Sequence, residues 1–266
     1  VYFLPVQVRK IDPKKSLLAR YERLLKKLVT KDLVDGKSVA IKIHLGGRYG
    51  FTHVHPAFII RVVSRVKECG GAPFLTDHRV DNKGAGYTPD AIGCPFYHAT
   101  GLKDSYAYDV KTGEKMLPVI HVAGYLHDAD VLINLSHAKG HGQCAFGAAI
   151  KNLGMGAVTG RTRTDIHALM DKAFAWHADK CIHCGKCVEV CEHSAIRFRD
   201  DGTLLQNSHH CTLCLHCMTV CPTGAITVSD KGWPKFQRGL ALATKAVLDT
   251  FEPKNVCLLY TSPSPR

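Results

Sequence analysis

The sequence contains no run of about 18 consecutive apolar residues, the minimum for a membrane-spanning helix. It also lacks, at its first residues, the charged and then apolar leader of a secreted protein. Its composition, 45 % hydrophobic and 22 % charged over 266 residues, excludes a disordered chain and allows one or two domains with a buried core. We therefore expect a cytoplasmic protein without a membrane span.

Acidic residues are scarce in residues 1–67, where 4 Asp and Glu stand against 15 Lys and Arg, whereas the rest of the chain has 19 against 20. Such a basic segment can attract nucleic acid or an acidic partner. Much of this charge, however, falls on the polar face of one predicted helix between Lys14 and Lys31. We therefore expect a solvated helix face and no nucleic-acid binding.

Both ends of the sequence are unusual. Residues 1–8 have the pattern of a strand but begin without Met. Residues 257–266 end in Tyr-Thr-Ser-Pro-Ser-Pro-Arg and resemble a translated sequencing adapter. We expect residues 257–266 to be a non-native tail, with a genuine Pro/Ser-rich tail as the alternative.

Hydrophobic periodicity predicts alternating helices and strands. Helices are predicted at 14–30, from Pro56 to about 69, at 146–153 with Gly154 as the stop, and at 236–251. Strands are predicted at 39–43, 74–77 and 131–135. This alternation is typical of a layered α/β fold with a mostly parallel sheet.

Eight of the 12 cysteines form a repeat with a period of 30 residues. Each copy reads C-x2-C-x2-C-x3-C, and an Ala-Ile pair follows it. Three cysteines on one tight loop can reach three irons of a [4Fe–4S] cluster, so the fourth ligand comes from the other copy. We predict one cluster on Cys181, Cys184, Cys187 and Cys221, and a second on Cys211, Cys214, Cys217 and Cys191. Zinc and disulfides are the alternatives.

Residues 179–229 resemble the bacterial-type two-cluster ferredoxins over about 50 residues. The resemblance implies a small α+β domain that carries single electrons, inserted between residues 1–178 and 230–256 of the α/β domain. Glu192 stands where the first copy would usually have proline, whereas Pro222 is present in the second. The added negative charge is expected to lower the potential of the nearer cluster, so the two potentials should differ.

Polar side chains follow three of the predicted strands, at the edge where ligands bind in doubly wound sheets. The candidates for catalysis are Lys42, His44, His137, Lys139 and His141. Asp77, His78, Lys151 and Asn152 are expected beside them. Imidazole, ammonium and carboxylate groups at one edge could bind an anion or a metal, or move protons.

The segment from Gly140 to Ala145 fits G-x-G-x-x-A, but no second strand with a terminal acid follows, so a packed turn or an anion site is favoured over a dinucleotide. Of the remaining cysteines, Cys69 is expected in the core and Cys144 is a candidate reactive thiol. Cys94 has no predicted role.

The α/β part is similar to the domain-of-unknown-function 362 family over nearly all of residues 1–256. The segments that carry this resemblance are 39–45, 71–77, 129–141 and 146–156. The resemblance implies iron–sulfur proteins of anaerobic bacteria and archaea, with a ferredoxin unit inserted late in an α/β domain. A more distant similarity to nickel-dependent racemase domains is also present.

Our leading hypothesis is a protein whose two clusters exchange electrons with a site at the sheet edge, and, if it is an enzyme, an iron–sulfur oxidoreductase. The redox partner or small-molecule substrate is not specified by the sequence. The alternatives are a metal-dependent, isomerase-like enzyme with accessory clusters and a nonredox binding protein with structural clusters.

Overall fold

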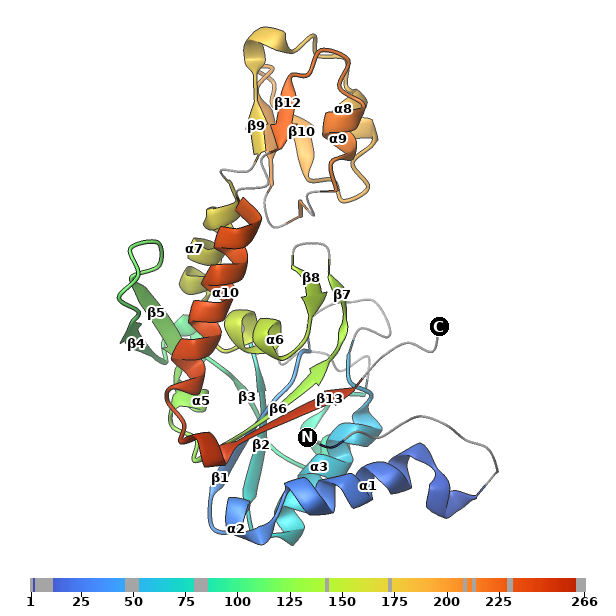
Figure 1. The fold of residues 1–266 in the computed structure, drawn as a ribbon, viewed down its shortest axis with the longest axis vertical. Coiled ribbons are helices and arrows are strands. Elements are labelled where there is room, and N and C mark those ends of the chain that lie inside the picture. Colours follow the sequence, from blue (N-terminus) through green and yellow to red (C-terminus); the bar gives the residue numbers. More distant parts are fainter. Residues whose placement is uncertain are drawn as a thin grey trace.

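The computed structural model describes residues 2, 12–45, 53–78, 86–141, 144–171, 174–207, 210–211, 214–228 and 232–261. Its centre is a five-stranded sheet in the order β13-β6-β1-β2-β3, in which all four neighbouring pairs are parallel (Figure 1). The strands are β1 (Ser38–Lys42), β2 (Ala72–Asp77), β3 (Phe96–His98), β6 (Val131–His137) and β13 (Val256–Thr261). The predicted α/β fold with a parallel sheet is confirmed, and all five strands end at the same edge.

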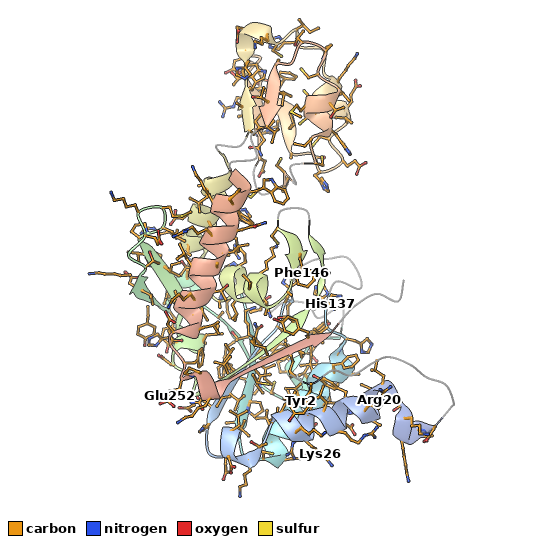
Figure 2. The ribbon with its side chains drawn as sticks, viewed as in Figure 1. Tyr2, Arg20, Lys26, His137, Phe146 and Glu252 are labelled. Carbon is orange, nitrogen blue, oxygen red and sulfur yellow. The ribbon has the colours of Figure 1, made fainter. Side chains whose placement is uncertain are left out.

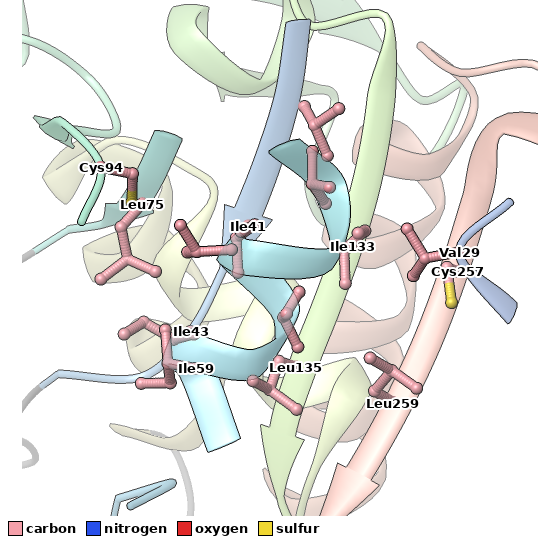
Figure 3. Packing of buried hydrophobic residues seen from close by; sticks show 14 of the residues in the cluster. Val29, Ile41, Ile43, Ile59, Leu75, Cys94, Ile133, Leu135, Cys257 and Leu259 are labelled. Carbon is pink, nitrogen blue, oxygen red and sulfur yellow. The ribbon is translucent and has the colours of Figure 1, made fainter. Parts of the chain in front are cut away.

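Helices cover both faces of the sheet. One face packs against α1 (Leu17–Leu28) and α3 (Pro56–Glu68), the other against α6 (Ala149–Gly156) and α10 (Gly232–Leu248). Ile41 and Ile133 lie in the first of these cores (Figure 3). The alternate residues Ala40 and Leu132 lie in the second, so each strand contributes side chains to both layers. Burial on both faces explains why these strands are almost uninterrupted apolar runs.

Shorter elements complete the α/β body. The helical turns are η1 (Pro13–Lys15), α2 (Lys31–Val34), α4 (Pro89–Ile92), η3 (Leu102–Asp104), α5 (Gly124–His127) and η5 (Pro253–Asn255). Two antiparallel hairpins are β4 (Ala107–Lys111) with β5 (Val119–Ala123), and β7 (Lys139–His141) with β8 (Ala145–Gly147). The second hairpin extends from the carboxyl end of β6. Within the described ranges, no helix combines the length and the apolar character needed to cross a bilayer.

The cysteine repeat folds into a small unit beyond the ends of α7 (Gly160–Asp171) and α10 (Figure 1). Two antiparallel strand pairs form it, β9 (Phe174–Trp176) with β12 (Ile226–Val228) and β10 (Ile196–Phe198) with β11 (Leu204–Gln206). The turn η4 (Ala178–Lys180) and the helices α8 (Lys186–Glu189) and α9 (His216–Thr219) complete it. Cys187, Ile196, Leu204 and Ile226 are its buried core.

Residues 256–261, most of which were expected to lie in a tail outside the fold, instead form edge strand β13. Its register pairs Val256 with Leu132 and Thr261 with His137, and Cys257 and Leu259 are buried. Alternating apolar residues give this segment one face that fits the core. The adapter origin of this segment stays a prediction. Residues 262–266 and, apart from Tyr2, the strand expected at 1–8 lie outside the described residues.

Gly154 does not end the helix as expected, because α6 continues to Gly156. Its role is close packing: a Cβ at Gly154 would lie 2.8 Å from the backbone oxygen of Leu240 on α10. Such contact with backbone cannot be relieved by rotating a side chain.

Gly154→Ala is therefore expected to lower the free energy of unfolding by about 1–2 kcal/mol, because overpacking exceeds the gain in helix propensity. Chemical denaturation measures it. Gly140→Ala is the control, since a Cβ there meets nothing within 4 Å, and equal stability of the two variants would contradict the packing argument.

Candidate functional site

Lys42, at the end of β1, is the centre of a buried polar network. Its side chain is 0 % exposed, and Nζ donates hydrogen bonds to Asp77 Oδ1 at 2.8 Å, Asn152 Oδ1 at 2.6 Å and the Ile43 carbonyl at 2.6 Å. Asp77 Oδ2 accepts a hydrogen bond from the Leu45 N–H at 2.8 Å. All three ammonium hydrogens of Lys42 therefore have acceptors, and the group is enclosed.

The network is built by the pleat of the sheet. Lys42, Asn134 and Ser136 lie on the α6 side of β1 and β6, and the Asn152 side-chain amide from α6 donates to Asn134 Oδ1 at 2.7 Å and Ser136 Oγ at 3.1 Å. Glycine at 156 makes this approach possible, because a Cβ there would overlap Lys42 Nζ and lie 2.6 Å from Asp77 Oδ1.

Burial opposes the charge on both partners of the ion pair. Burial raises the pKa of Asp77, but the charge and hydrogen bond of Lys42, together with His44 and the Leu45 N–H, hold the pKa below its usual range. Burial lowers the pKa of Lys42 despite the neighbouring carboxylate. The pair is held together because either group alone would be a buried, unpaired charge.

His44 lies at the rim of this network, with Nδ1 3.9 Å from Asp77 Oδ2 and a side chain that is 44 % exposed. Partial burial, followed by the positive charges of Lys139, Lys42 and Lys151, lowers its pKa against the opposing effect of Asp77. The imidazole is therefore neutral at pH 7 and accessible from outside.

The other sequence candidates lie on elements at the same edge of the sheet. His137, at the end of β6, is partly buried, and Figure 2 shows it at the base of the β7–β8 hairpin that carries Phe146. Lys139 and Lys151 are half-buried, and both act electrostatically on His44. The backbone of His141 lies in β7, but its side chain lies outside the described residues.

A second group lies at the same edge, beyond β2 and β3. The rings of His78 and His98 are 5.1 Å apart. His98 Nδ1 is 3.2 Å from Thr100 Oγ1, which donates to Asp104 Oδ1 at 2.5 Å. His78 was expected here, whereas His98 was missed because its strand has only three residues. Burial and then Arg163 and His98 lower the pKa of His78 to about 4.

The cysteines line two separate hollows in the small unit. One hollow is lined by Cys181, Cys184, Cys187 and Cys221, together with Ile182 and Trp176. The other is lined by Cys191, Cys211, Cys214 and Cys217, together with Leu215 and His216. Each hollow thus brings together three cysteines of one copy and the last cysteine of the other, which is the grouping that the spacing predicts.

The two hollows are built alike. Ala195 N–H donates to Cys191 Sγ, and Ala225 N–H donates to Cys221 Sγ, both at 3.2 Å. Gly185 is the N-cap of α8, with φ +76°, and Leu215 takes the equivalent position before α9 with φ +69°, a left-handed conformation that leucine rarely adopts. The Leu215 side chain lines the second hollow.

These hollows fit a cluster by the chemistry of their donors. A [4Fe–4S] cluster takes four thiolates, each on a different iron, so its ligands surround a space rather than a single point. Burial and then the nearby Cys211 and Cys214 raise the pKa of Cys217 to about 11, and positive iron would relieve this crowding of thiolates. Among the residues that the structure describes, no three His, Cys, Asp or Glu side chains form a group suited to a single metal ion.

The second hollow adjoins the α/β body. Cys211 and Cys144 both pack against the core formed by the sheet with α6, α7 and α10. Cys69 and Cys94 are buried in the opposite core, as expected for Cys69. Burial raises the pKa of the Cys144 thiol, although Lys151 opposes this, so this thiol is not activated at neutral pH.

Comparisons with known proteins bear on the fold and the family. A family profile described as "Domain of unknown function (DUF362)" matches residues 39–253. No curated protein matches. Among solved structures, a crystal structure of a Thermotoga maritima protein from a structural-genomics consortium is similar, with 12 % identity and a TM-score of 0.50. The similarity covers 95 % of this chain and 53 % of the other, so this chain spans about half the length of that protein.

Proposed function

The chain belongs to the DUF362 family, and from that premise we propose that it binds two [4Fe–4S] clusters in its cysteine-rich unit and exchanges single electrons between them and the sheet edge. One observation carries this proposal: each of two hollows is lined by the four cysteines of one predicted ligand set. Each cluster, when bound, supplies a one-electron carrier.

The route to the α/β body is supported by packing. Cys211, which lines the second hollow, also packs against the core beneath α6, α7 and α10. We infer that the ligand set of Cys191, Cys211, Cys214 and Cys217 is the one that exchanges electrons with the α/β body. The first set, whose hollow includes the 63 % exposed Ile182, faces an external redox partner.

The residues at the sheet edge divide into two roles. Lys42 is a positioning residue, because its ammonium is enclosed and holds Asp77 and Asn152 in place. His44 is the candidate catalytic residue: it is accessible, it lies beside Asp77, and its neutral ring can donate one hydrogen bond to a substrate and accept another. Lys139 acts on it electrostatically, and the roles of His137 and His141 stay predictions.

Anaerobic iron and sulfide analysis tests the proposal, combined with electron paramagnetic resonance after dithionite reduction. We expect about eight iron atoms per chain and a reduced spectrum with two interacting clusters. Cys69→Ala, in the α/β core, is the control and should keep the full iron content. Bound zinc with little iron would overturn the proposal.

A further inference from the structure

Trp176, in β9, has an indole nitrogen that is buried and has no hydrogen-bond acceptor in the part of the chain that the structure describes. An indole nitrogen can only donate, and when it is buried it usually has a partner. Burying such a donor without an acceptor is costly, because the hydrogen bond to water that it gives up is not replaced. An acceptor other than the polypeptide would remove this cost.

The side chain of Trp176 lines the first hollow, together with Cys181, Cys184, Cys187 and Cys221. The register of the strand pair β9–β12 places it there, because Trp176 pairs with Ile226, which lines the same hollow (Figure 1). Next to Ile226, the Ala225 N–H donates to Cys221 Sγ at 3.2 Å. The unpaired indole donor therefore shares its hollow with sulfur atoms, one of which already accepts a backbone hydrogen bond.

Neighbouring rings hold the indole in place. The rings of Trp176 and His183 lie edge to face, with their centroids 6.5 Å apart. The His183 ring packs in turn against Phe198 at 5.3 Å, and its Nε2 lies 3.1 Å from the Gly202 carbonyl oxygen. Phe198 lines the same hollow and, like Trp176, packs against the small core of the unit. These contacts limit the rotation of the indole, so its N–H keeps one direction.

The corresponding position in the second copy of the repeat has no indole. Thirty residues after Trp176, which is the period of the cysteine repeat, the chain has Gln206. Gln206 pairs with Ile196 as Trp176 pairs with Ile226, so the two positions also correspond in the structure. Among the described residues, Ile196 lines the second hollow and Gln206 does not. An indole donor is therefore a feature of the first hollow alone.

We propose that the Trp176 indole N–H donates a hydrogen bond to a sulfur atom of the cluster in the first hollow, either a sulfide or a cysteine Sγ, and thereby raises the reduction potential of that cluster. This inference deepens the proposed function and rests on it, because it requires a cluster in this hollow. It assigns to one side chain the control of the potential of one of the two electron carriers.

The effect on the potential has a definite sign. Reduction adds one electron to a cluster, and the added negative charge spreads over its sulfur atoms. Because hydrogen bonds to a more negative acceptor are stronger, the indole stabilises the reduced cluster more than the oxidised one. Hydrogen bonds to the sulfur atoms are among the features that set the potentials of iron–sulfur proteins. The electron comes from the external reductant and the proton stays on the indole nitrogen, so no covalent bond forms or breaks.

Trp176→Phe tests the inference, because it keeps an aromatic ring and removes the donor. The full chain, reconstituted anaerobically, is titrated with dithionite against redox mediators and followed by electron paramagnetic resonance. Half of the clusters should become harder to reduce than in the unaltered protein, while the other half keep their potential. We expect the equilibrium constant of reduction to fall about tenfold for the affected half, which is about 59 mV for one electron.

Trp233→Phe is the matched control, since Trp233 is the other tryptophan of the sequence and is not among the residues that line either hollow. It should leave the potential of the first cluster unchanged. If Trp176→Phe retains its iron and both of its potentials equal those of the unaltered protein, the inference is overturned.

A measurement on the natural side chain covers the case in which Trp176→Phe does not assemble its cluster. In Trp233→Phe protein labelled with ¹⁵N in the indole ring, Trp176 carries the labelled nitrogen. Electron–nuclear double resonance of the reduced protein should show a ¹⁵N hyperfine coupling, because spin density reaches a nitrogen that donates to a cluster sulfur. A reduced protein with no such coupling overturns the inference.

Iron content, measured on the same samples, separates this inference from the proposed function. About eight irons per chain, with neither a shifted potential nor a ¹⁵N coupling, contradicts only the role of Trp176. A chain that binds no iron contradicts the cluster proposal, and the role of Trp176 is rejected with it.

Discussion

Lys42→Met is expected to lower the free energy of unfolding by about 3–5 kcal/mol. The substitution keeps the length of the side chain but leaves the Asp77 carboxylate, 3 % exposed, without its cation. It also deprives Asn152 Oδ1 of its donor. An uncompensated buried charge is costly because the protein interior solvates it poorly. Urea denaturation, monitored by circular dichroism, measures the change.

A double variant separates the charge from the packing. Lys42→Met combined with Asp77→Asn removes the cation and the anion together, so it should recover part of the stability lost in Lys42→Met. Lys26→Met, on the exposed side of α1, is the control and should change stability by no more than about 0.5 kcal/mol. A loss below about 1 kcal/mol for Lys42→Met would show that the buried pair contributes little.

The second large effect is expected from pairs of cysteine substitutions. Cys181 and Cys221 belong to different copies of the repeat but line the same hollow, whereas Cys181 and Cys191 belong to one copy but line different hollows. Cys181→Ala/Cys221→Ala should therefore keep about four irons per chain, and Cys181→Ala/Cys191→Ala should keep almost none. Iron analysis after anaerobic reconstitution provides the comparison.

Ligation within each copy predicts the reverse order of iron content for these two variants, so the measurement decides between the arrangements. Cys144→Ala is the control, because Cys144 lines neither hollow. It should retain about eight irons.

The convergence at the sheet edge could be predicted because it follows from strand direction alone. Parallel strands end together, so the polar residues after 39–43, 74–77 and 131–135 had to meet. The enclosure of Lys42 could not be predicted in this way, because it depends on how closely α6 approaches, and that is set by Asn152 and by the missing Cβ of Gly156. A lysine at the end of a strand looks the same in the sequence whether its ammonium group is accessible or enclosed.

The features of the fold that the sequence pattern misjudged or missed also depend on contacts between distant parts of the chain or on very short elements. A glycine inside a helix resembles a stop signal when the packed partner is unknown, and Gly154 meets α10, which lies some 80 residues further along the chain. The three-residue strand β3 is too short for its periodicity to be recognised, and His98 was missed with it. By contrast, the grouping of the cysteines follows from local spacing and recurs in the two hollows.

The way in which the cysteine-rich unit is attached has a practical consequence. The chain enters the unit after α7 and returns through α10, and these helices pack along each other, with Ile166 and Met170 of α7 in the same core as Phe236 and Leu240 of α10. Excision of residues 174–228, with a short linker between the two helices, therefore removes none of the five sheet strands. Such a truncated protein would lack all eight cysteines of the two proposed cluster sites, so that ligands of the sheet edge could be screened in air and independently of cluster loading.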